Sequence, residues 1–70
     1  MNQLLLDIMG RHFLLHESEH PRIVNDRNVC EFLETATTVE EWNNTISAIQ
    51  DISLRAEIEQ SGLIHQILPS

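Results

Sequence analysis

Apolar residues recur at three- and four-residue spacings through most of the chain, which is the pattern of amphipathic helices. The first such segment covers about residues 2–17, and its apolar positions form a broad face that needs several neighbours to enclose it. Gly10 weakens this helix by about 1 kcal/mol relative to alanine, so the helix could break there and leave residues 11–17 extended. Pro21 stops the helix, because the residue before a proline is pushed out of the helical conformation. The apolar face consists of Leu4, Leu5, Ile8, Met9, Phe13 and Leu15.

A second helical segment is expected to begin near Asn25 or Asp26, since either side chain can cap the amide groups of a first turn. It ends at the threonine-rich residues 35–38, because β-branched residues are weak helix formers. The positions that we expect on one apolar face are Val29, Phe32, Leu33 and Ala36.

The third segment has the clearest start in the chain. Thr38 and Glu41 match the capping box, in which the hydroxyl and the carboxylate satisfy each other's unpaired backbone donors. Glu40 and Glu41 also suit the positive end of the helix dipole. Apolar residues then follow at spacings of three, four and three, a short heptad-like pattern. We call these four residues the Trp42 seam: Val39, Trp42, Ile46 and Ile49.

In the last part of the chain, Asp51 or Ser53 restarts or continues the helix, and Gly62 either ends it or is tolerated inside it. Helical spacing returns over residues 63–68, and Pro69 ends the pattern. No run alternates apolar and polar residues for long enough to indicate a strand. The sequence therefore predicts one all-α domain, residues 1–70, with three or four short helices.

The small size of the chain indicates a need for additional stabilisation. A chain of 70 residues buries only about 60% of the surface that its unfolded form exposes, and proteins of this size usually add disulfides, a metal or a partner subunit. Cys30 is the only cysteine, so no intrachain disulfide can form. A single cysteine is typical of a reducing compartment, where it acts as a small apolar side chain. We expect a homodimer, or a subunit of a larger assembly, that completes the helical bundle.

Charge and hydropathy limit the classes of function that this chain can have. Eleven acidic residues against four arginines give a formal net charge of −7, which argues against direct binding to DNA or RNA. An acidic surface favours a basic partner, although such a charge also simply keeps a small protein in solution. Asp7 interrupts the apolar run at 4–6, so no secretory signal is evident, and no stretch approaches a membrane span. We expect a cytoplasmic protein that does not enter the membrane.

Residues 16–20 read HESEH, which matches the H-E-x-x-H pattern of zinc hydrolases. In that pattern two helical histidines bind zinc and the glutamate acts as general base. A spacing of four places His16 and His20 on one face of a helix, with Glu17 beside the first ligand. A third ligand could come from the acidic pair at 40–41, which would leave the fourth position for water.

The stretch resembles the zincin metalloproteases over these five residues only. Zincins continue the helix past the second histidine, whereas Pro21 disfavours a helical conformation at His20. Ser18 and Glu19 stand where zincins carry a bulky apolar residue and an uncharged one. With four histidines and eight glutamates among 70 residues, the letters arise by chance in roughly one such chain in forty, so the motif alone is weak. A non-catalytic metal site would use His12, His16 and His20.

These observations predict a non-enzymatic protein with no catalytic residues, no cofactor and no metal. The Trp42 seam suits the internal core and a partner helix equally well, and we assign it as the candidate interface. The predicted function is that of a small acidic regulator that binds another protein, such as an inhibitor, an adaptor or an accessory factor of a mobile genetic element such as a phage. Two alternatives stay open: a zinc-binding protein or minimal metallohydrolase, and an acidic nucleic-acid mimic that occupies a basic partner surface.

Overall fold

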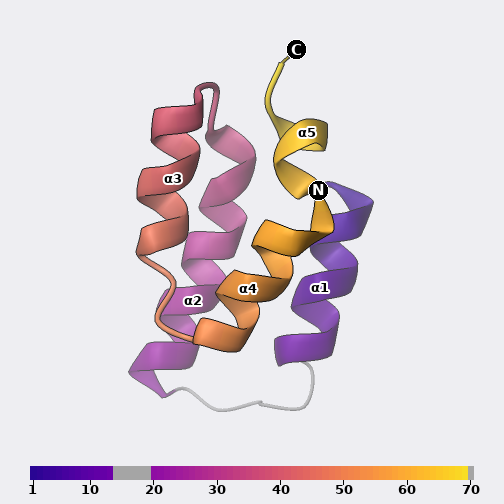
Figure 1. The fold of residues 1–70 in the computed structure, drawn as a ribbon. Coiled ribbons are helices and arrows are strands. Elements are labelled where there is room, and N and C mark those ends of the chain that lie inside the picture. The colour runs from indigo at the N-terminus through magenta and orange to yellow at the C-terminus, as the bar shows by residue number, and fades with distance from the viewer. Residues whose placement is uncertain (14–19, 70) are drawn as a thin grey trace.

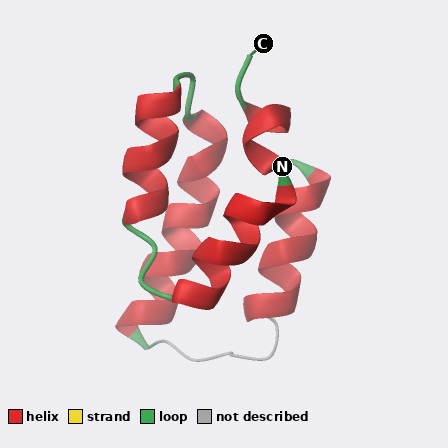
Figure 2. Ribbon diagram, in the orientation of Figure 1, coloured by secondary structure: helices red, strands yellow, loops and turns green. Residues whose placement is uncertain are grey.

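The computed structural model describes residues 1–13 and 20–69, and these form α-helices, one short 3₁₀-helix and no strand (Figures 1 and 2). The predicted all-α class is confirmed. The described part of the chain has five α-helices, where the sequence predicted three or four. The elements are α1 (Gln3–Phe13), α2 (Pro21–Phe32), the 3₁₀-helix η1 (Leu33–Thr35), α3 (Val39–Ser47), α4 (Ile52–Ser61) and α5 (Leu63–Ile67).

Helix α1 begins after Asn2, whose Oδ1 accepts hydrogen bonds from the backbone N–H of Leu4 at 2.9 Å and of Leu5 at 3.2 Å. These bonds satisfy donors that the first turn of a helix leaves unpaired. The helix continues through Gly10, so the break considered from the sequence does not occur. The predicted end of this segment near Glu17 lies outside the described residues.

Helix α2 begins at Pro21, and the predicted start at Asn25 or Asp26 is wrong. Proline suits the first helical position, because its φ is already helical and its missing N–H would have no partner there. The residue before it, His20, has φ −59° and ψ 132°, outside the helical region as predicted. Its Nδ1 accepts a hydrogen bond from the backbone N–H of Arg22 at 3.2 Å and so caps the helix.

Helix α3 begins as predicted, with Thr38 Oγ1 accepting a hydrogen bond from the backbone N–H of Glu41 at 3.1 Å. The second half of the predicted capping box is wrong. The Glu41 carboxylate accepts hydrogen bonds from the N–H and the hydroxyl of Thr37, one residue before the cap, at 3.3 and 3.0 Å. The glutamate therefore still fixes the chain at the helix entry, but it binds Thr37 instead of Thr38.

The last predicted segment is two helices. Asp51 caps α4 by accepting a hydrogen bond from the backbone N–H of Leu54 at 3.1 Å. Gly62 then adopts φ 79° and ψ 11°, a left-handed conformation that glycine reaches without the strain a Cβ would add. The chain turns there and α5 follows at once, so Gly62 ends the helix instead of lying within it.

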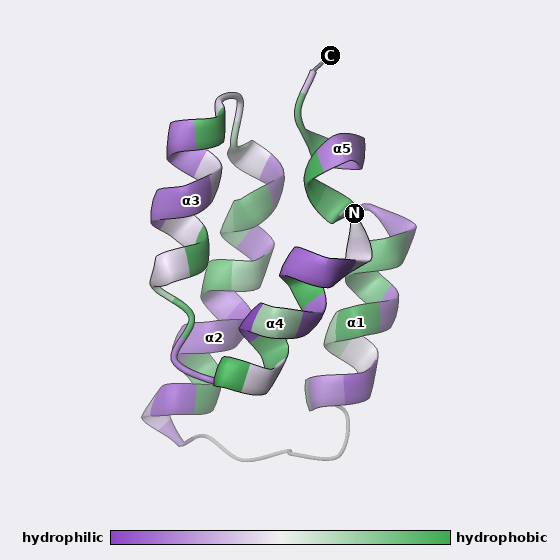
Figure 3. Cartoon of the chain, in the orientation of Figure 1, coloured by the Kyte–Doolittle hydropathy of each residue, from purple (hydrophilic) through white to green (hydrophobic). Residues whose placement is uncertain are grey.

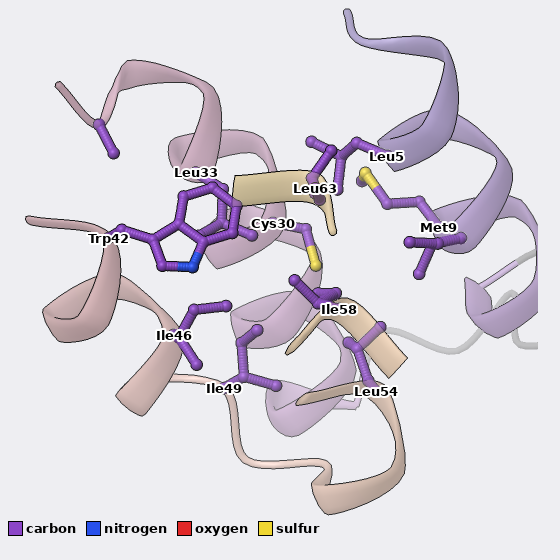
Figure 4. Close-up of a cluster of buried hydrophobic side chains, with 12 residues drawn as sticks. Leu5, Met9, Cys30, Leu33, Trp42, Ile46, Ile49, Leu54, Ile58 and Leu63 are labelled. Carbon is purple, nitrogen blue, oxygen red and sulfur yellow. The ribbon is translucent and has the colours of Figure 1, made fainter. Parts of the chain in front are cut away.

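The helices pack in two layers around one core. In Figure 1, α1 and α2 run antiparallel, α3 runs back along α2, and α4 crosses in front of α1 and α2. Hydrophobic residues occur on every helix, as the green segments of Figure 3 show, and the buried ones form one core cluster. The buried apolar residues come from α1, α2, η1, α3, α4, α5 and the connecting turns (Figure 4): Leu5, Ile8, Met9, Cys30, Leu33, Ala36, Trp42, Ile46, Ile49, Leu54, Ile58 and Leu63.

Candidate functional site

The HESEH stretch lies mostly outside the described residues, which include only His20 of its five positions. His20 stands before helix α2 and caps it, so this histidine is not carried on a helix as the zincin arrangement requires. Among residues 1–13 and 20–69, no group of three or more His, Cys, Asp or Glu side chains is placed to hold a metal ion. The interpretation of HESEH as a metal site stays a hypothesis without support from the described part.

The third histidine of that hypothesis, His12, takes part in a different contact. Its Nε2 lies 2.7 Å from Oε1 of Glu57 on α4, and Arg11 donates to the other carboxylate oxygen of Glu57. These hydrogen bonds, with the Arg11 bond the stronger cause, hold the pKa of Glu57 below its ordinary value. The cluster ties the end of α1 to α4 and has the character of a surface ion pair.

The sequence predicts the Trp42 seam as the interface, but in the fold three of its residues are buried and one is exposed. Trp42, Ile46 and Ile49 are at most 5% exposed and pack inside the chain's own core (Figure 4). Val39 is 58% exposed and lies beside the C-terminal residues Ile64 and Leu68. A partner helix could contact only Val39 without opening the core, and the role of the seam in an interface stays a prediction.

One buried carboxylate, Asp26, connects α2 to the turn between α3 and α4. The residue is 2% exposed, and its two oxygens accept hydrogen bonds from the backbone N–H groups of Gln50 and Asp51, both at 2.9 Å. The side chain of Asn25 donates to Asp26 Oδ1 at 2.9 Å and to the carbonyl oxygen of Ala48 at 3.1 Å. Every bond ends on the fold's own backbone or on a neighbouring side chain, so the role of this polar centre is structural.

The thiol of Cys30 is also structural. Burial, and next the negative charges of Asp26 and Glu31, raise its pKa to about 12. A thiol that keeps its proton is a poor nucleophile and a poor metal ligand. The sequence interpretation of Cys30 as a small apolar residue agrees with its complete burial.

The surface feature that sequence reasoning missed is a groove between α2 and α3 with a volume of about 410 Å³. Phe32 stands at this groove with 63% of its surface exposed, although the sequence placed it on the buried face of the second helix; that expectation is wrong. We call this feature the Phe32 groove, and its lining residues are Asn25, Asn28, Val29, Phe32, Asn44, Thr45 and Ala48.

The Phe32 groove combines an apolar wall with free amides and nearby acids. The side chains of Asn28 and Asn44 make no hydrogen bond with any other described residue, so both are available to a ligand. Exposed Glu31 adjoins Phe32, and exposed Glu41 lies one helical turn before Thr45. An apolar anchor with amide groups and a carboxylate rim is the composition of a protein-binding surface.

The −7 charge is carried largely on the outside of the molecule. Across the described ranges, six acidic residues are exposed, whereas Arg11 and Arg22 are the exposed arginines. None of the described helices combines the length and the apolar character needed to cross a membrane. The exposed acidic residues are Asp7, Glu31, Glu40, Glu41, Asp51 and Glu59.

Comparison of this chain with protein-family models, with curated proteins and with solved structures gives no match.

Proposed function

We propose that this chain is a small acidic, non-enzymatic module that binds a basic partner protein through the Phe32 groove. The observation that carries the proposal is the exposure of Phe32, 63%, on a helix whose other large apolar residues are half-buried. Aromatic residues that anchor interfaces contribute more binding energy than most of their neighbours. A large aromatic side chain left in water beside a groove gains free energy when a partner covers it.

The chemistry around Phe32 indicates the kind of partner. Asn28 and Asn44 offer both hydrogen-bond donors and acceptors across the groove. The carboxylates of Glu31 and Glu41 and the net charge of −7 favour a partner surface rich in lysine or arginine. An inhibitor, an adaptor or an accessory factor of a mobile genetic element such as a phage would act in this way. We also propose that the chain works in the cytoplasm as a homodimer.

The test compares three tagged proteins in affinity capture from cells: the natural chain, Phe32→Ser and the matched control Ile52→Ser. Ile52 is 77% exposed at the start of α4 and does not line the groove. We expect a basic protein that the natural chain and Ile52→Ser capture and that Phe32→Ser loses. With the purified partner, Phe32→Ser should weaken binding by about 30-fold, the effect of an interface anchor.

The salt dependence of that binding separates an apolar anchor from mimicry of nucleic acid. If Phe32 is the anchor, raising salt from about 0.05 to 0.3 M should weaken binding moderately while the loss in Phe32→Ser persists. If acidic residues alone carry the binding, high salt abolishes it and Phe32→Ser binds like the natural chain. That result, or capture of the same proteins by all three baits, would overturn the assignment of the groove.

A further inference from the structure

The outer face of α1 and α2 carries a second groove, larger and more apolar than the Phe32 groove. It has a volume of about 730 Å³ and is lined by residues of α1 and by Arg27 of α2. Leu6, 48% exposed, and half-buried Phe13 supply apolar surface, and Gly10 between them has no side chain. A face with a glycine at its centre allows the backbone of another helix to approach closely.

The charges at this groove differ from those of the rest of the molecule. Arg11, Arg27 and Asp7 line it, a local excess of positive charge in a chain with a net charge of −7. Arg11 is already bound to Glu57. Arg27 is half-buried and has no ion-pair or hydrogen-bond partner within the described residues, while Asp7 is exposed and accepts only from Gln3, at 2.9 Å. Among the described residues, Arg27 is therefore a cation without a partner and Asp7 is an accessible anion, and both line the same groove.

We propose that a second copy of this chain covers this face, with Asp7 of each copy paired to Arg27 of the other. Asp7 lies six residues before the end of α1, and Arg27 lies six residues after the start of α2. The two helices run antiparallel (Figure 1), and Asp7 on α1 and Arg27 on α2 both line the groove. A two-fold axis along the groove places α1 of one copy over α2 of the other, so both pairs form at once.

The charge of the whole chain favours this face over the others for self-association. Two copies each with a charge of −7 repel, and the repulsion is weaker at this face, where Arg27 balances Asp7 and Arg11 balances Glu57. The face is two helices wide and about 18 Å long at 1.5 Å per residue, which is small beside the roughly 1,000 Å² that a stable interface buries. We therefore expect dimers that form in the micromolar range, with a Kd of about 1–100 µM.

The inference rests on the proposed homodimer but not on the Phe32 groove. Variants that reverse the charge at Asp7 or at Arg27 test it. Asp7→Arg alone and Arg27→Glu alone each place like charges opposite each other, so each should raise the dimer Kd at least about tenfold. Mixing the two variants restores both pairs, and native mass spectrometry should show the mixed dimer, with a Kd within about threefold of that of the natural chain.

Two controls carry the same charge changes at exposed positions away from this groove, Glu59→Arg and Arg22→Glu. Both should dimerise like the natural chain, and Phe32→Ser should do so as well, which separates this face from the partner groove. Circular dichroism confirms that each variant folds. A natural chain that stays monomeric up to about 500 µM in sedimentation velocity, or a mixture of Asp7→Arg and Arg27→Glu that forms no mixed dimer, overturns the proposal. Partner binding that persists in such a monomer leaves the proposed function standing.

Discussion

Trp42 and Phe32 are aromatic residues on neighbouring helices that pack against each other, yet the fold uses them in opposite ways. Trp42 on α3 is 3% exposed and packs in the core, whereas Phe32 at the end of α2 is 63% exposed at the surface. The difference comes from the phase of each residue along its helix. The buried residues Asp26, Cys30 and Leu33 follow one another at spacings of four and three, so they lie on one side of the helix. Phe32 comes one residue before Leu33 and therefore lies off that buried side.

The comparison shows that a short helix can bury only one side. Leu33 follows Phe32 directly, and two consecutive helical residues diverge by about 100°, so both cannot enter the core. In α3 the buried residues Trp42 and Ile46 lie on one side, four positions apart, while Val39 stays exposed. Phe32, which does not fit on the buried side, therefore stays at the surface, where a partner protein can contact it.

The largest expected effect on the free energy of unfolding comes from removing the buried aromatic side chain of Trp42. Trp42→Ala removes a fully enclosed aromatic side chain and leaves a cavity that neighbours such as Ile46 and Leu33 cannot fill, so we expect a loss of about 3–5 kcal/mol. Because small domains have unfolding free energies of about 5–15 kcal/mol, the variant should be close to unfolded. Urea denaturation followed by far-UV circular dichroism measures the loss. A change below about 1 kcal/mol would mean that Trp42 is not part of the tightly packed core.

The second effect tests whether the turn at residues 50–51 depends on the buried carboxylate. Asp26→Ala leaves the backbone N–H groups of Gln50 and Asp51 without their acceptors, and we expect a loss of about 2–4 kcal/mol. Asp26→Asn keeps one acceptor oxygen and should lose about half as much. Hydrogen exchange of the amides at 50 and 51 should rise in both variants. Unchanged exchange in Asp26→Ala would show that the turn holds without α2.

The fold class and the starts of two helices could be predicted from the sequence, because these features depend on local chemistry. Helical periodicity and the caps at Thr38 and Asp51 need only a few neighbouring residues. The start of α2 could not be predicted correctly, because Asp26 resembles a helix cap in sequence but accepts hydrogen bonds from residues 24 and 25 positions away. Pro21 did offer a local signal, because proline is common at the first helical position, but its other role in ending the preceding segment was the one considered.

The candidate site was harder to predict than the fold. The Trp42 seam has the apolar spacing of an interface helix, and the same spacing equally describes a helix that packs in its own core. The only sequence feature that indicated the exposure of Phe32 is its position next to Leu33. Leu33 continues the helical spacing of Asp26 and Cys30, so Leu33 and not Phe32 occupies the buried side. The second groove brings residues of α1 together with Arg27 of α2, and no short sequence pattern specifies how two helices pack.

A smaller effect on stability is expected at Glu57, whose half-buried carboxylate lies in a surface ion pair. Hydrogen bonds from Arg11 and His12 lower the pKa of Glu57 below its ordinary value of 4.5. The resulting stabilisation is complete above that value and is lost as the pH falls through the lower folded pKa. Because the ion pair lies at the surface, with the Arg11 side chain 60% and the Glu57 side chain 33% exposed, Glu57→Gln should lose less than about 1 kcal/mol near neutral pH.

Melting temperatures measured between about pH 6 and pH 3 test this dependence. The difference between the natural chain and Glu57→Gln should shrink as the pH falls below 4.5. The matched control Glu59→Gln, at an exposed position on the same helix, should show no such pH-dependent difference. A difference that is constant with pH would mean that Glu57 stabilises the fold by packing instead of by charge.

The smallest expected effect on stability is at Phe32. Because 63% of its surface is already exposed in the folded chain, Phe32→Ser should change the free energy of unfolding by no more than about 0.5 kcal/mol. The measurement is urea denaturation beside Trp42→Ala, with binding to the partner recorded on the same samples. If Phe32→Ser loses partner binding but keeps its stability, then Trp42 stabilises the fold and Phe32 contacts the partner. A loss above about 1.5 kcal/mol would instead show that Phe32 is packed in solution, and the groove would then lose its anchor.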